Sequence, residues 1–482
     1  MVEAPSINLR RLCSDTLPPM VSTTSSNKSQ EELPRILSAT NALAIVVGII
    51  IGSGIFLVPR EMMAAVGSSH LVYAVWITAG LLSLCGAMSY AEVAAMRPRV
   101  GGEYAFLYDA YGPLTAFLYT WTWTVIAKPA SIATIAAGLM RVLGTFPYFA
   151  FLDRVAISHI FGYDFLWGQV MAIAATWLIT GLNIVSTRDS AQLQTALTWL
   201  KVLMILIIAG LCFTSIKYGD WHNFGTKFVG ARGGFSGFMV ALIAALWAYD
   251  GWSDVSQMAG EVKKPQQSLP MALIGGVAIV ATLYMLTNAA VEYILPSSVI
   301  AISDRPATDA LRLVAGNVGA GLVAAGMAVS ICATFVGSSL SGARVPFAAA
   351  RDRLFPSILG RIHPRFKTPW TSLLLQAILS SLLLLAIGRF QALFSLAIFS
   401  EWLFYALTAA TVFVFRIREP DAHRPYRVTG YPVVPALFIL AAVVLLVFSF
   451  VDQPRESIAG VAVILCGIPL HFLFQRKQIP TL

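Results

Sequence analysis

Two glycine-containing stretches interrupt long apolar runs near their middles: Gly52-Ser53-Gly54 and Tyr249-Asp250-Gly251-Trp252-Ser253. Glycine, serine and aspartate weaken the interior of a helix, so both runs are predicted to be broken helices. A broken helix exposes unpaired N–H groups where its second half begins and unpaired carbonyl groups where its first half ends. These two stretches therefore have the chemistry to bind a small polar ligand through bare backbone groups.

The exposed backbone groups match both ends of a free amino acid. The amides of Ser53, Gly54 and Ile55 are predicted to bind a carboxylate at the positive end of a half-helix. Four residues have carbonyls placed to accept hydrogen bonds from an ammonium group: Ile50, Ile51, Trp247 and Ala248. Glycine at Gly52 and Gly54 lets a ligand approach the backbone closely. The pattern predicts a zwitterionic ligand rather than a sugar or an inorganic ion.

The elements that carry these stretches are typical of a membrane protein. Of the 482 residues, 57% are hydrophobic and 12% are charged, whereas a soluble domain has about 25% charged residues. Each of the longest apolar runs could cross about 30 Å of hydrocarbon as a helix. Twelve such runs are predicted, at residues 39–66, 70–95, 103–142, 166–186, 190–216, 235–262, 269–294, 319–350, 369–388, 391–416, 432–452 and 456–475. We therefore expect an all-α integral membrane protein with twelve transmembrane helices.

Several other kinds of site are not indicated. The six histidines lack the spacing of a zinc site, and the five cysteines are too far apart for a metal knuckle or a disulfide framework. The sequence has no G-x-x-x-x-G-K-[ST] phosphate loop, and its apolar runs show no nucleophile paired with a base. Its net charge of +9 comes from basic clusters between apolar runs. We therefore expect no enzyme, cofactor, metal or nucleic-acid partner, but a small molecule and the lipid bilayer.

The two breaks fall in the first and the sixth apolar run, which are the first members of two sets of five. Because five is odd, the second set must enter the membrane from the opposite side, as in an inverted repeat. Broken helices at corresponding positions of two such repeats indicate a transporter's binding site. The alternative is that these glycines only allow close helix packing. The expected parts are a disordered tail (1–36), two repeats (37–216 and 233–417), two further helices (432–475) and a second tail (476–482).

Orientation follows from the 33 lysines and arginines, most of which lie in segments that are cytoplasmic if the N-terminal tail is inside. The densest basic cluster lies between runs 8 and 9. We therefore expect both termini to be cytoplasmic and the protein to be a multi-pass protein of the plasma (inner) membrane.

Four motifs carry a resemblance to a known family: Ile50-Ile51-Gly52-Ser53-Gly54-Ile55-Phe56, Gly101-Gly102-Glu103-Tyr104, Trp247-Ala248-Tyr249-Asp250-Gly251-Trp252 and residues 341–369. Over about residues 38–475 the chain resembles a prokaryotic-type member of the L-type amino acid transporter family, in the amino acid–polyamine–organocation superfamily. This resemblance implies a five-plus-five inverted repeat that works by alternating access without sodium, usually as an exchanger. Eukaryotic members pair with a glycoprotein through a cysteine between spans 3 and 4. The corresponding loop here, about 143–165, has no cysteine, so no covalent heavy-chain subunit is expected.

Ionisable groups inside a span are costly and are therefore candidates for function. Lys201 matches the lysine that family members place beside span 1, which implies that its ammonium bridges unwound carbonyls where sodium binds in sodium-coupled relatives. Glu401 matches a position that faces the substrate and could set selectivity or carry a proton. For both residues, a purely structural ion pair is the alternative.

Further candidates lie near the second break. Asp250 matches a position that is acidic in the family branch accepting cationic as well as neutral amino acids, although aspartate also favours the N-cap of a half-helix. Trp247 matches an aromatic gate, with core packing as the alternative. Lys128, in a Lys-Pro pair that the resemblance also covers, is expected to pair with Asp250 or Glu401. Three serines could line the pocket or only pack between helices: Ser338, Ser339 and Ser341.

The sequence thus predicts a sodium-independent exchanger of neutral and possibly cationic L-amino acids. A proton-coupled amino acid or polyamine symporter, with Glu401 or Asp250 as the protonated group, is the alternative. A sensor that binds without transporting is a third reading.

Overall fold

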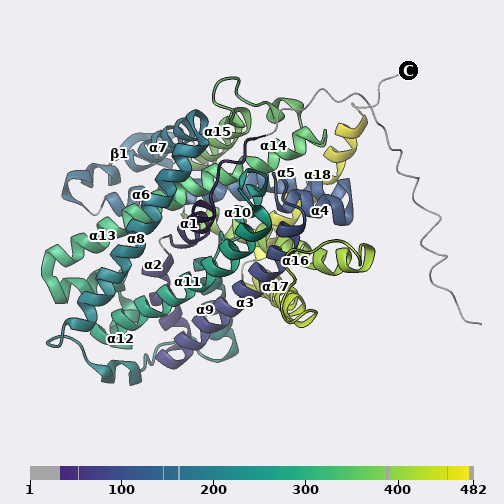
Figure 1. Cartoon of the computed structure of the whole chain (residues 1–482). Helices are drawn as coiled ribbons and strands as arrows, with labels where there is room; N and C mark the ends of the chain where they lie inside the picture. Colours follow the sequence, from purple (N-terminus) through teal and green to yellow (C-terminus); the bar gives the residue numbers. More distant parts are fainter. Residues whose placement is uncertain are drawn as a thin grey trace, which may run out of the picture. The chain divides into compact units, whose positions relative to one another are not determined.

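A computed structural model describes residues 33–476, apart from 53, 145, 161–162, 387–389 and 453, and helices dominate this part of the chain (Figure 1). Its first elements are α1 (Ala39–Ile50), α2 (Gly54–Val66), α3 (Ser69–Met96), α4 (Glu103–Tyr111), α5 (Pro113–Thr122), a π-helical turn (Trp123–Ala127), α6 (Lys128–Leu143), a 3-10 helix (Pro147–Asp153), β1 (Val155–Ile160), β2 (Tyr163–Leu166), α7 (Trp167–Val185) and α8 (Thr187–Thr214). The later elements are a 3-10 helix (Trp221–Gly225), α9 (Gly234–Ala248), α10 (Asp254–Gln257), a 3-10 helix (Ala259–Glu261), α11 (Pro265–Ile294), α12 (Ser297–Ile302), α13 (Pro306–Gly342), α14 (Arg344–Arg351), a 3-10 helix (Ser357–Gly360), α15 (Trp370–Ala386), α16 (Phe390–Arg418), α17 (Val433–Asp452) and α18 (Pro454–Arg476).

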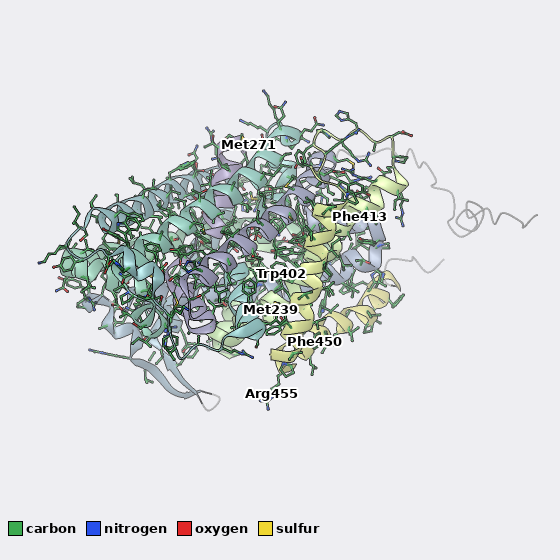
Figure 2. The ribbon with its side chains drawn as sticks, turned by 90° about the horizontal axis from the view of Figure 1, so that it is seen from below. Met239, Met271, Trp402, Phe413, Phe450 and Arg455 are labelled. Atoms are coloured by element: carbon green, nitrogen blue, oxygen red, sulfur yellow. The ribbon has the colours of Figure 1, made fainter. Side chains whose placement is uncertain are left out.

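Within the described residues, eight helical segments are long and apolar enough to cross a membrane: Ser69–Met96, Pro113–Leu143, Trp167–Val185, Thr187–Thr214, Pro265–Ile294, Pro306–Arg351, Val433–Val451 and Ser457–Phe474. Three shorter apolar helices accompany them: Ala39–Ile50, Gly234–Ala248 and Trp370–Ala386. The outer surface of the bundle is apolar as well. Met271 lies at the margin in Figure 2 and is 47% exposed, whereas Met239 and Trp402 lie inside. This pattern suits a protein whose solvent is lipid.

The structure differs from the sequence-based expectations in two places, at Gly112 and in the loop after α6. The run expected at 103–142 is divided at Gly112, where φ is +88°, and only Pro113–Leu143 has the length and composition of a span. Leu33 and Leu37 are buried, and Leu37 bridges to Val262. A two-stranded antiparallel hairpin, β1–β2, lies in the loop after α6, so the chain is not helical throughout.

Helix α1 begins with a reciprocal cap. The Ser38 hydroxyl accepts from the Asn41 N–H at 3.1 Å, and the Ser38 N–H donates to Asn41 Oδ1 at 3.0 Å. This capping box satisfies two N–H groups that would otherwise be unpaired. Asn41 also donates to Thr195 Oγ1 at 2.9 Å, which connects the start of α1 to α8. The start of α1 is thus held against α8, the helix that carries Lys201.

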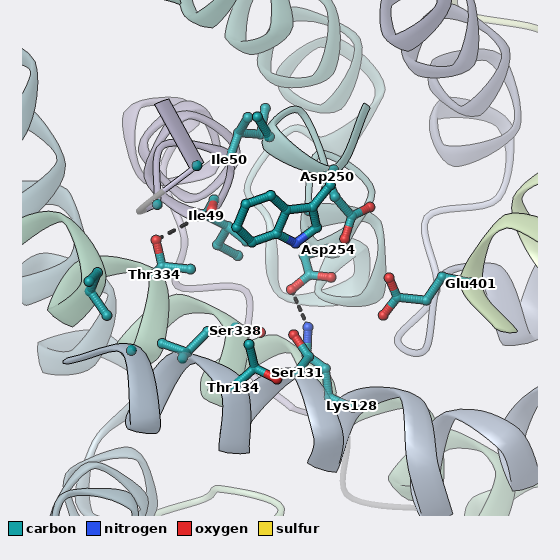
Figure 3. Close-up of a pocket in the computed structure, with 18 of the residues that line it drawn as sticks. Ile49, Ile50, Lys128, Ser131, Thr134, Asp250, Asp254, Thr334, Ser338 and Glu401 are labelled. Carbon is teal, nitrogen blue, oxygen red and sulfur yellow. Dashed lines mark hydrogen bonds and ion pairs between the residues drawn. The ribbon is translucent and has the colours of Figure 1, made fainter. Parts of the chain in front are cut away.

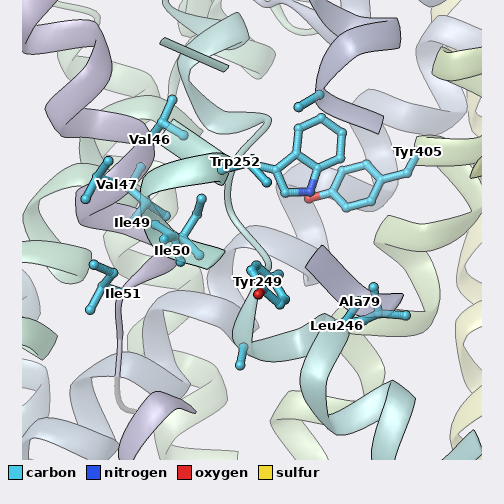
Figure 4. Packing of buried hydrophobic residues seen from close by; sticks show 14 of the residues in the cluster. Val46, Val47, Ile49, Ile50, Ile51, Ala79, Leu246, Tyr249, Trp252 and Tyr405 are labelled. Atoms are coloured by element: carbon cyan, nitrogen blue, oxygen red, sulfur yellow. The ribbon is translucent and has the colours of Figure 1, made fainter. Parts of the chain in front are cut away.

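A packed apolar core surrounds both helix breaks (Figure 4). Val46, Val47 and Ile49 of α1 lie on one side, and Tyr249 and Trp252 follow α9 on the other. Gly251 has φ +94°, a conformation that L side chains rarely adopt. A Cβ atom on this glycine would lie 2.4 Å from Ile49 Cγ2. Glycine is therefore required where the second break passes the end of α1.

A fully buried ion pair, Arg344 with Glu261, lies at the C-terminal end of α13. The Arg344 guanidinium donates to Glu261 Oε1 at 2.8 Å and Oε2 at 3.0 Å, and to Thr187 Oγ1 at 3.2 Å. Both side chains are at most 1% exposed. The pair holds together the start of α8, the segment after α10 and the junction of α13 with α14.

Removing one partner of this pair should destabilise the protein strongly. For Arg344→Met we expect a loss of about 3 to 5 kcal/mol, because Glu261 would keep an uncompensated buried charge. The double variant with Glu261→Met should be less damaged than either single variant. Melting temperatures of the detergent-purified proteins measure this effect, with exposed Arg361→Met as the control. Equal melting temperatures for Arg344→Met and the control would contradict the expectation.

Candidate functional site

Both predicted helix breaks are present. Helix α1 ends at Ile50 and α2 begins at Gly54, and Ile51 between them has a non-helical ψ of 85°. Ser53 lies outside the described residues. Helix α9 ends at Ala248 and α10 begins only at Asp254. Within the breaks the backbone leaves the regular helical pattern: the Gly52 N–H donates to the Ile50 carbonyl at 2.8 Å, and the Asp250 N–H donates to the Trp247 carbonyl at 3.0 Å.

The two breaks face each other at close range. A Cβ atom added to Gly54 would lie 3.0 Å from Ala248 Cβ and 3.1 Å from Ala248 Cα. It would also lie 3.4 Å from Trp247 Cζ3. The start of α2 therefore lies directly against the end of α9, with no room for a side chain between them.

One tyrosine bridges the ends of the two first half-helices. The Tyr284 hydroxyl of α11 lies 2.7 Å from the Ala248 carbonyl oxygen and 3.0 Å from that of Ile50. The sequence analysis did not identify this residue, because nothing in the spacing places α11 beside both breaks. The single proton of its hydroxyl is shared between the two carbonyls, and the Ile50 carbonyl also accepts from the Gly52 N–H at 2.8 Å.

Lys201 lies at the first break. Its ammonium donates to the carbonyls of Gly48 and Ile51, both at 2.6 Å, and to that of Ser330 at 3.1 Å. The Ser330 hydroxyl also donates to the Ile51 carbonyl, at 2.7 Å. Lys201 is 1% exposed. The Ile51 carbonyl, one of four expected to accept from a ligand, is thus occupied by protein groups.

A central cavity lies between the breaks and the faces of α6, α13 and α16 (Figure 3). Nine of the candidates named from the sequence line it: Ile50, Gly52, Gly54, Lys128, Trp247, Ala248, Asp250, Ser338 and Glu401. Ile51 and Ile55 are not among its lining residues, and both are buried. The walls that sequence reasoning did not identify come mainly from three helices: Ser131, Thr134, Ile135 and Gly138 of α6, Ile331 and Thr334 of α13, and Tyr405 of α16.

The charged pair in the cavity differs from the expected one. Lys128 was expected to pair with Asp250 or Glu401, but its ammonium lies 2.5 Å from Asp254 Oδ2. The Ser341 hydroxyl donates to the same oxygen at 2.7 Å. Asp254 was missed by the sequence analysis, although its place four residues after Asp250 in the broken run was an available signal.

Asp250 and Glu401 line the cavity close to Tyr405. The Tyr405 hydroxyl donates to Asp250 Oδ1 at 3.0 Å. The N-cap of α10 is Ser253, without a side-chain cap hydrogen bond, so the alternative that Asp250 caps the half-helix has no support in this geometry. With Asp254, three carboxyl groups line the cavity against one ammonium group, that of Lys128.

Of the three serines, only Ser338 lines the cavity. The Ser339 carbonyl accepts from Gln376 Nε2 at 3.1 Å, and Ser341 binds Asp254. Trp247 lines the cavity where α9 ends. This position fits both a gate and a residue that packs in the core.

Comparison with known proteins places this architecture in a family. Residues 37–471 match the model of the family described as amino acid permease. The chain belongs to the amino acid permease family. This permease is 30% identical over 442 residues to the serine/threonine exchanger SteT of Bacillus subtilis (strain 168), which covers 91% of this chain and 96% of that protein.

Human relatives confirm the resemblance to L-type amino acid transporters. The permease is 29% identical over 444 residues to the cystine/glutamate transporter of Homo sapiens, covering 92% of this chain and 86% of that protein. It is 28% identical over 449 residues to the human b(0,+)-type amino acid transporter 1, covering 92% and 88%. The permease is therefore a multi-pass membrane transporter and not an enzyme.

Proposed function

We propose that this permease exchanges amino acids across the membrane without sodium, by binding both ends of the zwitterion at the two helix breaks. The observation that carries the proposal is the direct apposition of Gly54, at the start of α2, and Ala248, at the end of α9, beside the central cavity. The relatives named above as exchangers and transporters of amino acids support the same class of substrate.

The substrate carboxylate binds to N–H groups in the first turn of α2, which have no partner within the helix and lie at its positive end. The substrate ammonium takes the remaining lone pair of the Ala248 carbonyl, beside the Tyr284 hydroxyl, since the Ile50 carbonyl already accepts from the Gly52 N–H and from Tyr284. Gly52 and Gly54 leave room for this approach, and Trp247 acts as the gate over the ligand.

Independence from sodium is supported by Lys201. Its ammonium lies among the carbonyls of Gly48, Ile51 and Ser330. A buried fixed cation in an oxygen cage takes the place of a mobile cation.

We infer that the substrates are neutral and cationic L-amino acids. Asp250 and Glu401 line the cavity, and no described lysine or arginine lies within 4.0 Å of either carboxyl group. A cationic substrate side chain could compensate these carboxyl groups.

The carboxyl groups of Asp250 and Glu401 also support the second candidate, a proton-coupled amino acid or polyamine symporter. Uptake driven by a pH gradient into vesicles without internal amino acid would favour that second candidate.

Asp250→Asn should reduce uptake of arginine and lysine about tenfold, because the side chain of the substrate loses a buried charge partner. Uptake of alanine and leucine should change little. The measurement is initial uptake of the four labelled amino acids, with exposed Asp220→Asn as the matched control. An equal loss for all four substrates would count against a role in selectivity.

The paired breaks also support the proposed topology. It has twelve transmembrane helices in two inverted repeats, residues 37–216 and 233–417, followed by residues 432–475. Both termini are cytoplasmic, and the membrane is the plasma (inner) membrane. No covalent heavy chain is attached, since residues 143–165 contain no cysteine.

Exchange is tested in proteoliposomes loaded with labelled L-serine, with choline replacing sodium. External amino acids should release the label, and vesicles without external amino acid should retain it. A panel of the twenty amino acids as external partners identifies the substrates. Release that requires sodium, or that is equal without external amino acid, would overturn the proposal.

A further inference from the structure

A second cavity adjoins the central one. We call it the outer vestibule; among its lining residues are Arg60 of α2, Arg141 of α6, and Arg305 and Arg312 at the start of α13. Gly138 of α6 lines both cavities, so they meet at this residue. In the proposed topology the outer vestibule opens to the outside.

The two cavities are lined by the same faces of α6 and α13. On α6, Thr134 lines the central cavity, and Arg141, seven residues further on, lines the outer vestibule. On α13, Thr334 lines the central cavity and Met327 lines the outer vestibule, again seven residues apart. Seven residues are about two helical turns, so each pair shares one face of its helix. A ligand that enters between α6 and α13 therefore passes the arginines before reaching the breaks.

The charge of the outer vestibule is opposite to that of the central cavity. Besides the four arginines, its charged lining residues are Glu61 and Asp304. Arg60 pairs with Asp304, and Arg312 lies 4.0 Å from Asp309. Within the part of the chain that the structure describes, Arg141 and Arg305 have no carboxylate partner. The outer vestibule is thus positive, whereas three carboxyl groups and one ammonium group line the central cavity.

We propose that Arg141 and Arg305 form an outer subsite that binds the carboxylate of an arriving amino acid before it reaches the helix breaks. This rests on the proposed function. Guanidinium groups suit this ligand, because they donate paired hydrogen bonds to a carboxylate. The opposite charges of the two cavities orient the zwitterion with its ammonium group inward and its carboxylate outward.

The orientation agrees with the direction of α2. This helix runs from Gly54 at the central cavity to Arg60 and Glu61 at the outer vestibule. Gly54 and Arg60 are six residues apart, which corresponds to about 9 Å along the helix. In this proposal the carboxylate passes from the subsite on α6 and α13 to the N–H groups at the start of α2, without turning the ligand round.

The subsite is tested by comparing transport from the two faces. The double variant Arg141→Gln, Arg305→Gln should raise the KM for L-serine about three- to tenfold in right-side-out membrane vesicles. The KM in inside-out vesicles and the kcat should stay as in the unchanged protein. Salt should lower kcat/KM from the outside in the unchanged protein and much less in the double variant. Arg455→Gln is the matched control, since Arg455 lies at the start of α18 and points away from the ribbon in Figure 2.

A second measurement does not depend on transport. Asn317→Cys places a thiol in the outer vestibule, and its reaction rates with a negative and a positive methanethiosulfonate report the local charge. The negative reagent should react faster than the positive one, acetate should slow it, and the double arginine variant should remove both effects. A protein without the introduced cysteine gives the background rate.

The outcomes separate this inference from the proposed function. An unchanged external KM, or equal rates for the two reagents without protection by acetate, overturns the subsite and leaves amino acid exchange standing. Absence of exchange for every amino acid in the unchanged protein, together with charge-selective and acetate-protected labelling, overturns the proposed function and retains the carboxylate subsite.

Discussion

Gly54→Val should abolish amino acid exchange, lowering its rate at least about a hundredfold. The first added carbon would lie 3.0 Å from Ala248 Cβ and 3.1 Å from Ala248 Cα, and the two methyl groups beyond it need more room. The start of α2 and the end of α9 would be forced apart, and the carboxylate site would be filled. Initial exchange rates and equilibrium binding of labelled L-serine, measured on purified protein, check this expectation.

The matched control for this variant is Gly210→Val in α8. A Cβ atom at Gly210 meets no atom within 4 Å, so the same substitution should leave exchange unchanged. Both variants should elute as monodisperse protein, which separates loss of the site from loss of the fold. Exchange by Gly54→Val at half the normal rate or more would show that substrate does not bind between the breaks.

Lys201→Ala is expected to have the second large effect, a loss of exchange of about a hundredfold or more. Hydrogen bonds to a charged group contribute about 1.5 to 3 kcal/mol each, and Lys201 makes two at 2.6 Å and one at 3.1 Å. Without the ammonium group, the carbonyls of Gly48 and Ile51 would lose their charged partner and keep only the hydroxyls of Thr334 and Ser330. The end of α1 should then lose its defined unwound shape, so that binding and turnover fail together.

Lys217→Ala, in the exposed segment after α8, is the control for this charge change. Lys201→Arg should also fail, because a planar guanidinium group cannot take the place of a compact ammonium group in this cage. Normal exchange by Lys201→Ala, with or without sodium, would contradict the assigned role.

The helices were largely predictable, because apolar length is a local property of the sequence. The run predicted at 70–95 corresponds to Ser69–Met96, and the run at 269–294 to Pro265–Ile294. The breaks were predictable for the same reason, since glycine and aspartate act on the helix that contains them. The hairpin β1–β2 was missed because its strands are short and lie in a loop, where neither length nor apolar character marks them.

The site was only partly predictable. Asp250 and the residues around Gly54 were found because they lie in the breaks themselves. The Lys128–Asp254 pair joins residues 126 positions apart, and Tyr284 reaches both carbonyls from α11. Such contacts depend on how the helices pack. The hydrogen bonds of the Ile51 carbonyl were not predictable for the same reason, because its partners Lys201 and Ser330 come from α8 and α13.

The most direct test of the central claim is a cryo-EM structure of this permease with L-serine bound. The account predicts the carboxylate within hydrogen-bonding distance of N–H groups in the first turn of α2, and the ammonium group within hydrogen-bonding distance of the Ala248 carbonyl. A serine carboxylate bound to Lys128, with the N–H groups at Gly54 left without a ligand, would contradict it.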